Sequence, residues 1–210
     1  MAARATSLPP LRLSYASVEQ RYTEGKECTM GLPQLKHHGY TLKDWEGWEG
    51  RWELINGEAY DMTPAPSTEH QGIVTALSAQ VFMGLEEAKK KAGGGNCRSF
   101  VAPTDVYLES GVVQPDILVV CDPAKVSKRG IEGAPDLVVE ILSPSTGKKD
   151  LTWKRWAYQA AGVPEYLIVD PDEHWGLLLR LENGQYREVC RINYGGLLPL
   201  LDGKLSITLG

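Results

Sequence analysis

Two acidic residues stand in apolar segments of the chain, where a carboxylate needs a compensating partner. The segment PDLVVEILSP is aliphatic from Leu137 to Leu142 except for Glu140. A second segment, QPDILVV, places Asp116 directly before another apolar run. An unpaired buried carboxylate is costly, so such a group shifts its pKa, pairs with a cation or binds a metal. Glu140 therefore marks a candidate functional site.

Asp116 and Asp136 are the two acids that could join Glu140. Asp136 lies four residues before Glu140 on the same predicted strand, about 13 Å away, which is too far to share one metal. Asp116 opens a different predicted strand and converges with Glu140 if the two strands pair; the alternative is a turn residue after Pro115. Two converging carboxylates suit Mg²⁺, which can polarise a phosphate and activate a water.

Phosphodiester hydrolysis also needs a fixed positive charge near the phosphorus, and Lys154 is the candidate. Leu142 stands two residues after Glu140, so that face of the strand carries no lysine. Lys154 lies in the first turns of a predicted helix that begins near Asp150, where it aligns with Tyr158 and Ala161 at helical spacing. Two orientations remain open, because this lysine could extend outward into solvent or reach back to Glu140.

His70 lies near the start of the first long predicted helix. Thr68 and Gln71 match a T-x-x-Q capping box, and the glycines at 93–95 predict the end of the helix. An inward face is indicated by His70, Val74, Leu77 and Val81 at helical spacing. His70 is thus either a site residue or a histidine that is hydrogen-bonded within the core.

The remaining patterns predict alternating strands and helices. We expect a short helix after Tyr40 with Thr41 as N-cap and Gly50 as its stop. The segment WELINGEAYDM predicts a hairpin with an Asn56-Gly57 turn. Further elements are strands at Ser99–Leu108, Ile117–Cys121, Leu137–Leu142 and Tyr166–Val169, a helix from about Asp150 to Ala161, and a hairpin around Asn183-Gly184. This order predicts a mixed sheet with helices against it, an α/β or α+β domain.

Length and composition predict one soluble domain. We divide the 210 residues into a loosely ordered arm, residues 1–38, and a single domain, residues 39–210. His37 and His38 end the arm; a metal role for them would need further ligands. The four cysteines include no C-x-x-C pair, so they suggest neither a zinc knuckle nor a disulfide framework, and we expect a reducing, cytoplasmic location. The net charge of −5 argues against global charge as the means of binding nucleic acid.

The ordered combination QPDILVV…PDLVVEILSPST…D…K…Y…AGVPEYLIVDP resembles the Uma-type family of endonucleases, within the PD-(D/E)xK nuclease superfamily. The likeness extends back through GYTLKDWEG and RWELINGEAYDMTPAPSTEHQ, and it covers about residues 40–209. It implies a restriction-endonuclease-like core in which Asp116 and Glu140 bind metal. The superfamily's E-x-K pattern ends here in Leu142, and the family's lysine on the following helix matches Lys154.

The resemblance also draws attention to acids near the first long helix. Glu69 and His70 open that helix, where the superfamily often carries an acidic residue near the metal. Glu58 matches a recurring position of the family's ELINGE motif, and a solvated strand charge is its alternative.

Together these patterns predict a metal-dependent endonuclease that hydrolyses DNA phosphodiester bonds with Mg²⁺, for which Mn²⁺ is expected to substitute. Asp116 and Glu140 hold the metal, Lys154 orients the water or stabilises charge on the phosphate, and His70 acts as a nearby ligand or proton carrier. We expect DNA as the partner, a homodimer and no membrane association. Two alternatives stay open: a catalytically weak nucleic-acid-binding or regulatory protein that retains the fold, and an oligomeric structural protein in which Glu140 meets a buried Arg or Lys.

Overall fold

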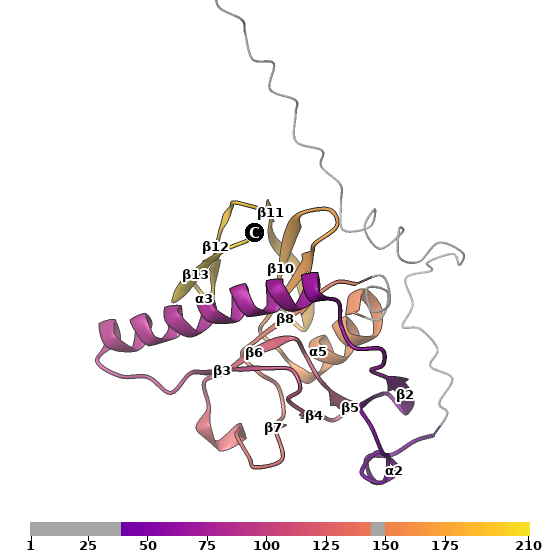
Figure 1. The fold of residues 1–210 in the computed structure, drawn as a ribbon. Helices are drawn as coiled ribbons and strands as arrows, with labels where there is room; N and C mark the ends of the chain where they lie inside the picture. Colours follow the sequence, from indigo (N-terminus) through magenta and orange to yellow (C-terminus); the bar gives the residue numbers. More distant parts are fainter. Residues whose placement is uncertain (1–38, 144–149) are drawn as a thin grey trace, which may run out of the picture. The chain divides into compact units, whose positions relative to one another are not determined.

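A six-stranded mixed sheet forms the centre of the fold (Figure 1). Its strand order is β11-β10-β9-β8-β6-β3. The strands are β3 (Arg98–Val101), β6 (Ile117–Val120), β8 (Leu137–Ile141), β9 (Glu165–Asp170), β10 (Trp175–Glu182) and β11 (Gln185–Asn193). Strands β8 and β9 are parallel, and the other neighbours are antiparallel. The computed structural model describes residues 39–143 and 150–210, which lie in one compact unit.

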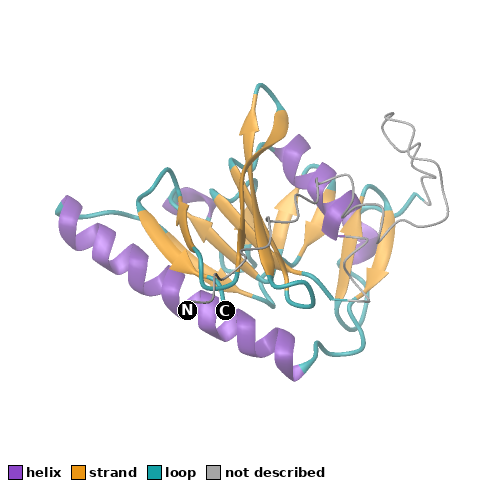
Figure 2. Cartoon of the chain, turned by 90° about the horizontal axis from the view of Figure 1, so that it is seen from above, coloured by secondary structure: helices purple, strands orange, loops and turns teal. Residues whose placement is uncertain are grey.

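Helices cover both faces of this sheet (Figures 1 and 2). The long helix α3 (Thr68–Ala92) buries Leu77, Val81 and Leu85 against one face, where Val119 and Val139 belong to the same core cluster. A turn of π-helix, η2 (Asp150–Lys154), leads into α5 (Arg155–Ala161) on the other face. Because side chains alternate along a strand, residue 140 of β8 faces α5 whereas residues 139 and 141 face α3.

A second sheet of five strands has the order β2-β1-β5-β4-β7. It contains β1 (Trp52–Ile55), β2 (Glu58–Asp61), β4 (Val106–Leu108), β5 (Gly111–Val113) and β7 (Ile131–Glu132). The expected Asn56-Gly57 turn is confirmed, with φ of 52° and 81°, the left-handed values that a two-residue hairpin turn needs. The smaller elements are α2 (Leu42–Trp45), η1 (Pro123–Lys125) and a hairpin of β12 (Leu197–Leu200) and β13 (Leu205–Thr208).

Three expected boundaries were wrong. The predicted strand Ser99–Leu108 is divided between the two sheets, because Pro103 has no N–H with which to continue the ladder after β3. The N-cap of α3 is Ser67, whose Oγ accepts the His70 N–H at 3.1 Å, and Thr68 is already helical. Thr41 caps α2 as expected, but α2 ends at Trp45, well before Gly50.

Cys97 and Cys121 form a disulfide, which the sequence did not suggest. The two cysteines flank the antiparallel pair β3–β6, in which Arg98 lies opposite Val120. Extending that register by one residue places the two cysteines directly opposite each other, although 24 residues separate them in sequence. The expected arm, residues 1–38 with His37 and His38, lies outside the described residues.

Candidate active site

Strand pairing brings Asp116 and Glu140 to the same end of the central sheet. Ile117 of β6 lies opposite Val139 of β8, so the next pair in this antiparallel register is Asp116 and Glu140. Residues placed directly opposite each other have Cβ atoms about 4.5–5.5 Å apart. Asp116 Oδ2 accepts the Ile141 N–H at 2.8 Å. Asp136 lies at the other end of β8, where its carboxylate accepts the Cys121 N–H at 2.7 Å.

His70 reaches the same place from the first turn of α3. Its Nε2 lies 3.2 Å from Asp116 Oδ2 and 3.1 Å from the Ile141 carbonyl oxygen. The His70 side chain is 8% exposed, so it belongs to the inward face of α3 as the spacing predicted. A proton on Nε2 can be donated to either acceptor. His70 therefore contacts a candidate metal ligand directly.

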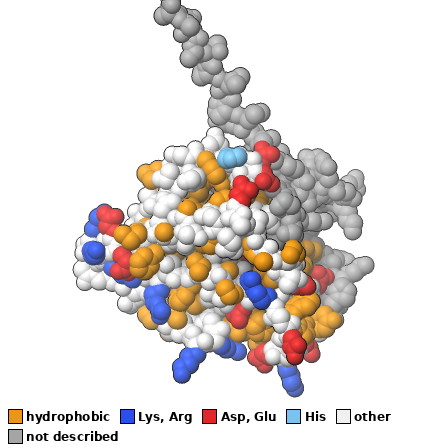
Figure 3. All heavy atoms as spheres, viewed as in Figure 1, with side chains coloured by type: hydrophobic (Ala, Val, Ile, Leu, Met, Phe, Trp, Pro, Cys, Tyr) orange, Lys and Arg blue, Asp and Glu red, His pale blue; other side chains and the backbone are white. Residues whose placement is uncertain are grey.

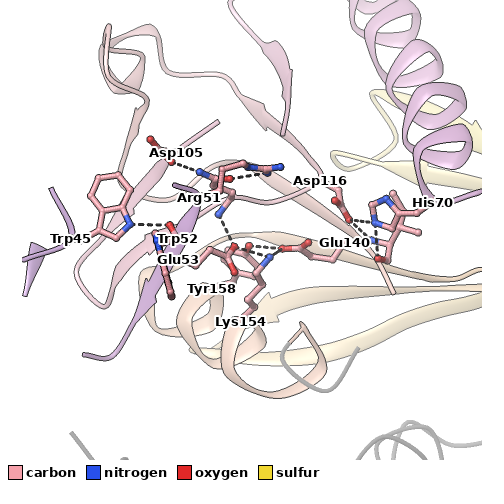
Figure 4. Close-up of polar contacts among 12 residues, drawn as sticks. Trp45, Arg51, Trp52, Glu53, His70, Asp105, Asp116, Glu140, Lys154 and Tyr158 are labelled. Atoms are coloured by element: carbon pink, nitrogen blue, oxygen red, sulfur yellow. Dashed lines mark hydrogen bonds and ion pairs between the residues drawn. The ribbon is translucent and has the colours of Figure 1, made fainter. Parts of the chain in front are cut away.

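Lys154 is buried and points toward Glu140. Its Nζ lies 2.8 Å from Glu140 Oε1 and 3.0 Å from Glu53 Oε1, and only 2% of the residue is exposed (Figure 4). Of the two orientations left open by the sequence, the structure shows the inward one. Buried charges are stable only when they are paired and hydrogen-bonded, and this lysine has two carboxylates as partners.

Glu53 is the residue of this group that the sequence reasoning missed. It lies on β1 and is fully buried, and its Oε1 also accepts the Gln114 N–H at 2.8 Å. Its signal was available in WELI, an acid within an apolar strand, which is the same anomaly that marked Glu140. The acid of that motif singled out instead, Glu58, is half-buried and accepts the Tyr60 hydroxyl at 2.9 Å. Glu69 is exposed on α3.

Tyr158 is the second donor to Glu140. Its hydroxyl donates to Glu140 Oε1 at 2.7 Å, one helical turn after Lys154. Burial, followed by the negative charges of Glu140 and Glu53, raises the pKa of Tyr158 well above its usual value of 10.0. The phenol therefore stays protonated at neutral pH and acts as a donor. Lys154 and Tyr158 together hold one oxygen of the Glu140 carboxylate.

Asp116, Glu140 and Lys154 line a cleft of about 660 Å³, a volume within the usual range for ligand sites. His70 also contributes to its wall. The wall is completed by Trp153 of η2 and by residues on or beside the five-stranded sheet and in the segment that leads into α3, among them Arg51, Tyr60, Met62, Pro64 and Gln114. The cleft is thus large enough for a substrate group beside a metal ion.

The oxygen ligands at this end of the sheet fit a hard divalent cation. Asp116 and Glu140 supply carboxylates, and the Ile141 carbonyl lies beside them. Mg²⁺ is commonly bound by one or two carboxylates and keeps several waters. Within residues 39–143 and 150–210, no group of three or more His, Cys, Asp or Glu side chains is arranged to hold a metal. A cation here would therefore complete its coordination with water and substrate oxygens.

Helices cover both faces of the mixed central sheet (Figure 2), and Asp116, Glu140 and Lys154 line one cleft, with Glu140 and Lys154 buried and Asp116 partly exposed. The sequence profile of the Uma2 family, described as "Putative restriction endonuclease", matches residues 40–205, and the chain belongs to this family. The expected resemblance is confirmed, with nearly the same limits.

A solved structure has the same fold as this chain. A crystal structure of "a putative nuclease belonging to DUF820" from Anabaena variabilis ATCC 29413 superposes with a TM-score of 0.64 at 19% sequence identity. The match covers 80% of this chain and 94% of that one. A search of curated proteins found no match.

Proposed function

We propose that this protein is a Mg²⁺-dependent endonuclease that hydrolyses phosphodiester bonds of DNA. The observation that carries the proposal is that Asp116 and Glu140, from neighbouring strands, line the same cleft, whose wall also contains a buried lysine. Family membership supports a nuclease in general. The finer assignment to DNA and to Mg²⁺ rests on the oxygen ligands and on the family's description as restriction endonucleases.

Each polar residue has a role in this proposal. Asp116 and Glu140 would hold the Mg²⁺, which when bound would supply an acidified water and positive charge beside a phosphate oxygen. Lys154 and Tyr158 fix the Glu140 carboxylate through Oε1, while His70 and the Ile141 N–H fix Asp116. Lys154 also lines the cleft, where it orients the attacking water.

The hydrolysis itself exchanges one oxygen on phosphorus for another. The water oxygen forms a bond to phosphorus as the bond to one deoxyribose oxygen breaks. The water gives up a proton, and the released sugar oxygen takes one up. His70, which lies next to Asp116, is the proposed carrier of such a proton.

The surface and the helices of the protein are relevant to its partners and its location. No helix within the described ranges is long and apolar enough to cross a membrane. On the face shown in Figure 3, acidic and basic side chains are interspersed with hydrophobic ones, so the described residues form no continuous basic patch there. We propose a homodimer, because a two-fold axis would present one site to each strand of a duplex. A cytoplasmic location follows from a DNA substrate, and for that location the Cys97–Cys121 disulfide is unusual.

The structural alternative has one observation in its favour, because Glu140 does meet a buried lysine. An ion pair alone gives no reason for Asp116 and His70 to lie beside it at an open cleft. The second alternative, a catalytically weak binding protein, shares every residue of the site and differs only in turnover.

Cleavage of supercoiled plasmid in Mg²⁺ or in EDTA tests the proposal. The parent should nick or linearise the plasmid only with Mg²⁺, and Asp116→Asn should lower the rate by about 10²-fold or more. Asp136→Asn is the matched control, because Asp136 stands outside the cleft, and it should retain activity. A parent that binds Mg²⁺ and DNA but does not cut would establish the binding protein. Faster cleavage of RNA than of DNA of the same sequence would overturn the assignment to DNA.

A further inference from the structure

Arg51 is a second cation in the cleft, and its surroundings differ from those of Lys154. It directly precedes β1, is half-buried and lines the same cleft as Asp116, Glu140 and Lys154 (Figure 4). Its Nη2 donates to Gln114 Oε1 at 3.0 Å, and its Nε is buried with no hydrogen-bond partner. Within residues 39–143 and 150–210, no carboxylate forms an ion pair with this guanidinium. The positive charge of Arg51 is therefore not neutralised by any carboxylate among these residues.

Gln114 explains why this charge stays uncompensated. Its Nε2 donates to Asp105 Oδ1 at 2.7 Å, and since an ionised carboxylate only accepts, the amide oxygen must face Arg51. Gln114 thus stands between the guanidinium and Asp105 and offers a neutral acceptor. Its main-chain N–H binds Glu53, so the placement of Arg51 is tied to the Glu53–Lys154–Glu140 group.

The two cations are consequently suited to different tasks. The Lys154 side chain is 3% exposed and its ammonium contacts two carboxylates, so its charge is largely balanced within the protein. Arg51 has no carboxylate among the described residues, and it presents the planar donor group that binds phosphate oxygens in pairs. A phosphate entering the cleft would find its counter-charge at Arg51.

We propose that Arg51 is the phosphate-binding residue of the cleft and that Gln114 is its positioning residue. The ligand is a phosphate group of the nucleic-acid backbone, so the inference rests on the proposed function and deepens it. Arg51 binds the phosphate oxygens that gain negative charge during hydrolysis, while Lys154 acts on Glu140 and the water. Gln114 acts only through Arg51, by holding the guanidinium without neutralising it.

Chemical modification of the unaltered protein tests the contact. Phenylglyoxal reacts with accessible arginines, and peptide mapping by mass spectrometry gives the rate at each one. Thymidine 5′-monophosphate with Mg²⁺ should slow the modification of Arg51 severalfold and leave Arg187, an exposed arginine outside the cleft, unchanged. Equal rates at Arg51 with and without the nucleotide would overturn the proposal.

Variants test the roles of the two residues separately. Arg51→Gln should weaken the affinity for thymidine 5′-monophosphate by about tenfold or more, and Arg51→Lys should restore part of it. Gln114→Glu keeps the arginine but supplies it with a carboxylate, so it should weaken nucleotide binding similarly; because it also replaces the donor to Asp105, circular dichroism should first establish that the variant is folded. Arg187→Gln is the control and should bind like the parent. If Arg51→Gln and Gln114→Glu also bind like the parent, both assignments are wrong.

Plasmid cleavage separates this inference from the proposed function. Arg51→Gln should lower the cleavage rate by about 10²-fold. Nucleotide binding that depends on Arg51 in a parent that cuts neither DNA nor RNA would disprove the nuclease and leave the phosphate site standing. If the parent cuts DNA and the Arg51→Gln variant cuts it equally fast, the nuclease assignment stands and the phosphate-binding role of Arg51 is wrong. Should Arg51→Gln fail to fold, the modification of the unaltered chain decides.

Discussion

The Lys154 ammonium lies 2.8 Å from Oε1 of Glu140, and both side chains are almost completely buried. Glu53 adds a second carboxylate at 3.0 Å, so one cation joins the helical turn η2 to a strand of each sheet. Asp116 lines the same cleft, so three carboxylates lie near one ammonium. A divalent cation would balance the excess negative charge. The metal-free site is therefore expected to lower the stability of the protein.

Removing the positive charge of Lys154 should make the excess negative charge at the site measurable as a loss of stability. Lys154→Met leaves Glu53 and Glu140 facing each other, so the free energy of unfolding in EDTA should fall by about 3 kcal/mol or more. Mg²⁺ should stabilise the variant more than the parent, because the acids then lack their ammonium, and plasmid cleavage should be lost. Urea denaturation in EDTA and in Mg²⁺ measures both effects. The exposed Lys204→Met is the control, and a Lys154→Met protein as stable as this control in EDTA would contradict the account.

Glu140→Gln should have the opposite effect on the metal-free protein. Since Glu53 still pairs with Lys154, the change removes one excess negative charge, and the variant should be more stable than the parent in EDTA by about 1 kcal/mol. Mg²⁺ should raise the melting temperature of the parent by mass action and hardly affect the variant.

A second buried glutamate provides the matched control for that experiment. Glu165 is 3% exposed and binds Arg180 at 2.9 Å and the Leu201 N–H at 2.7 Å, away from the cleft. Glu165→Gln should lower the melting temperature equally in EDTA and in Mg²⁺. If Glu140→Gln behaves in the same way, Glu140 serves the fold and its metal role is wrong.

Local sequence signals predicted much of the fold. The Asn-Gly pairs at 56–57 and 183–184 form the expected turns, and Gly93 and Gly162 end their helices with φ of 68° and 85°. Those features depend on only a few neighbouring residues. The division of Ser99–Leu108 between two sheets and the Cys97–Cys121 bond depend instead on which strands pair, which no local pattern specifies.

Some residues of the candidate site could likewise be predicted from local sequence, and others could not. Asp116 and Glu140 could be found because acids beside or within apolar strands are conspicuous. Lys154 could be found because it lies on the helix that follows Glu140, where the family resemblance also expects the lysine. Glu53 carried the same signal as Glu140, an acid within an apolar strand, but it and Arg51 lie on or beside a strand of the second sheet. Only the packing of that sheet brings Arg51 to the cleft and Glu53 to Lys154. Gln114 has no chemistry of its own to attract attention, and its contacts appear only in three dimensions.

Tyr158 should contribute to stability through a charged acceptor. Its hydroxyl donates to the buried Glu140 carboxylate, so Tyr158→Phe should lower the free energy of unfolding by about 1.5–3 kcal/mol. The matched control is Tyr186→Phe, whose hydroxyl donates to the neutral Val163 carbonyl at 2.9 Å; its cost should be about 1 kcal/mol. Equal costs for the two variants, measured by urea denaturation, would mean that Glu140 is not a charged acceptor.

The raised pKa of Tyr158 also predicts a dependence on alkaline pH. The folded-state pKa lies above the unfolded value of about 10, so the folded protein holds the proton longer than the unfolded chain. The stabilising contribution is full below pH 10 and is lost as the pH rises toward the folded-state pKa. The free energy of unfolding should thus fall more steeply above pH 10 in the parent than in Tyr158→Phe. Parallel curves would contradict the buried, protonated phenol.

Crystals grown with Mn²⁺ test the central claim most directly, because the anomalous signal of Mn²⁺ locates it independently of activity. The account predicts a peak between the carboxylates of Asp116 and Glu140, within reach of the cleft, and the loss of that peak in Asp116→Asn. Crystals of Asp136→Asn should retain it. A parent crystal at saturating Mn²⁺ with no peak at these two carboxylates, and with Lys154 and Glu140 still paired, would show a structural ion pair in place of a metal site.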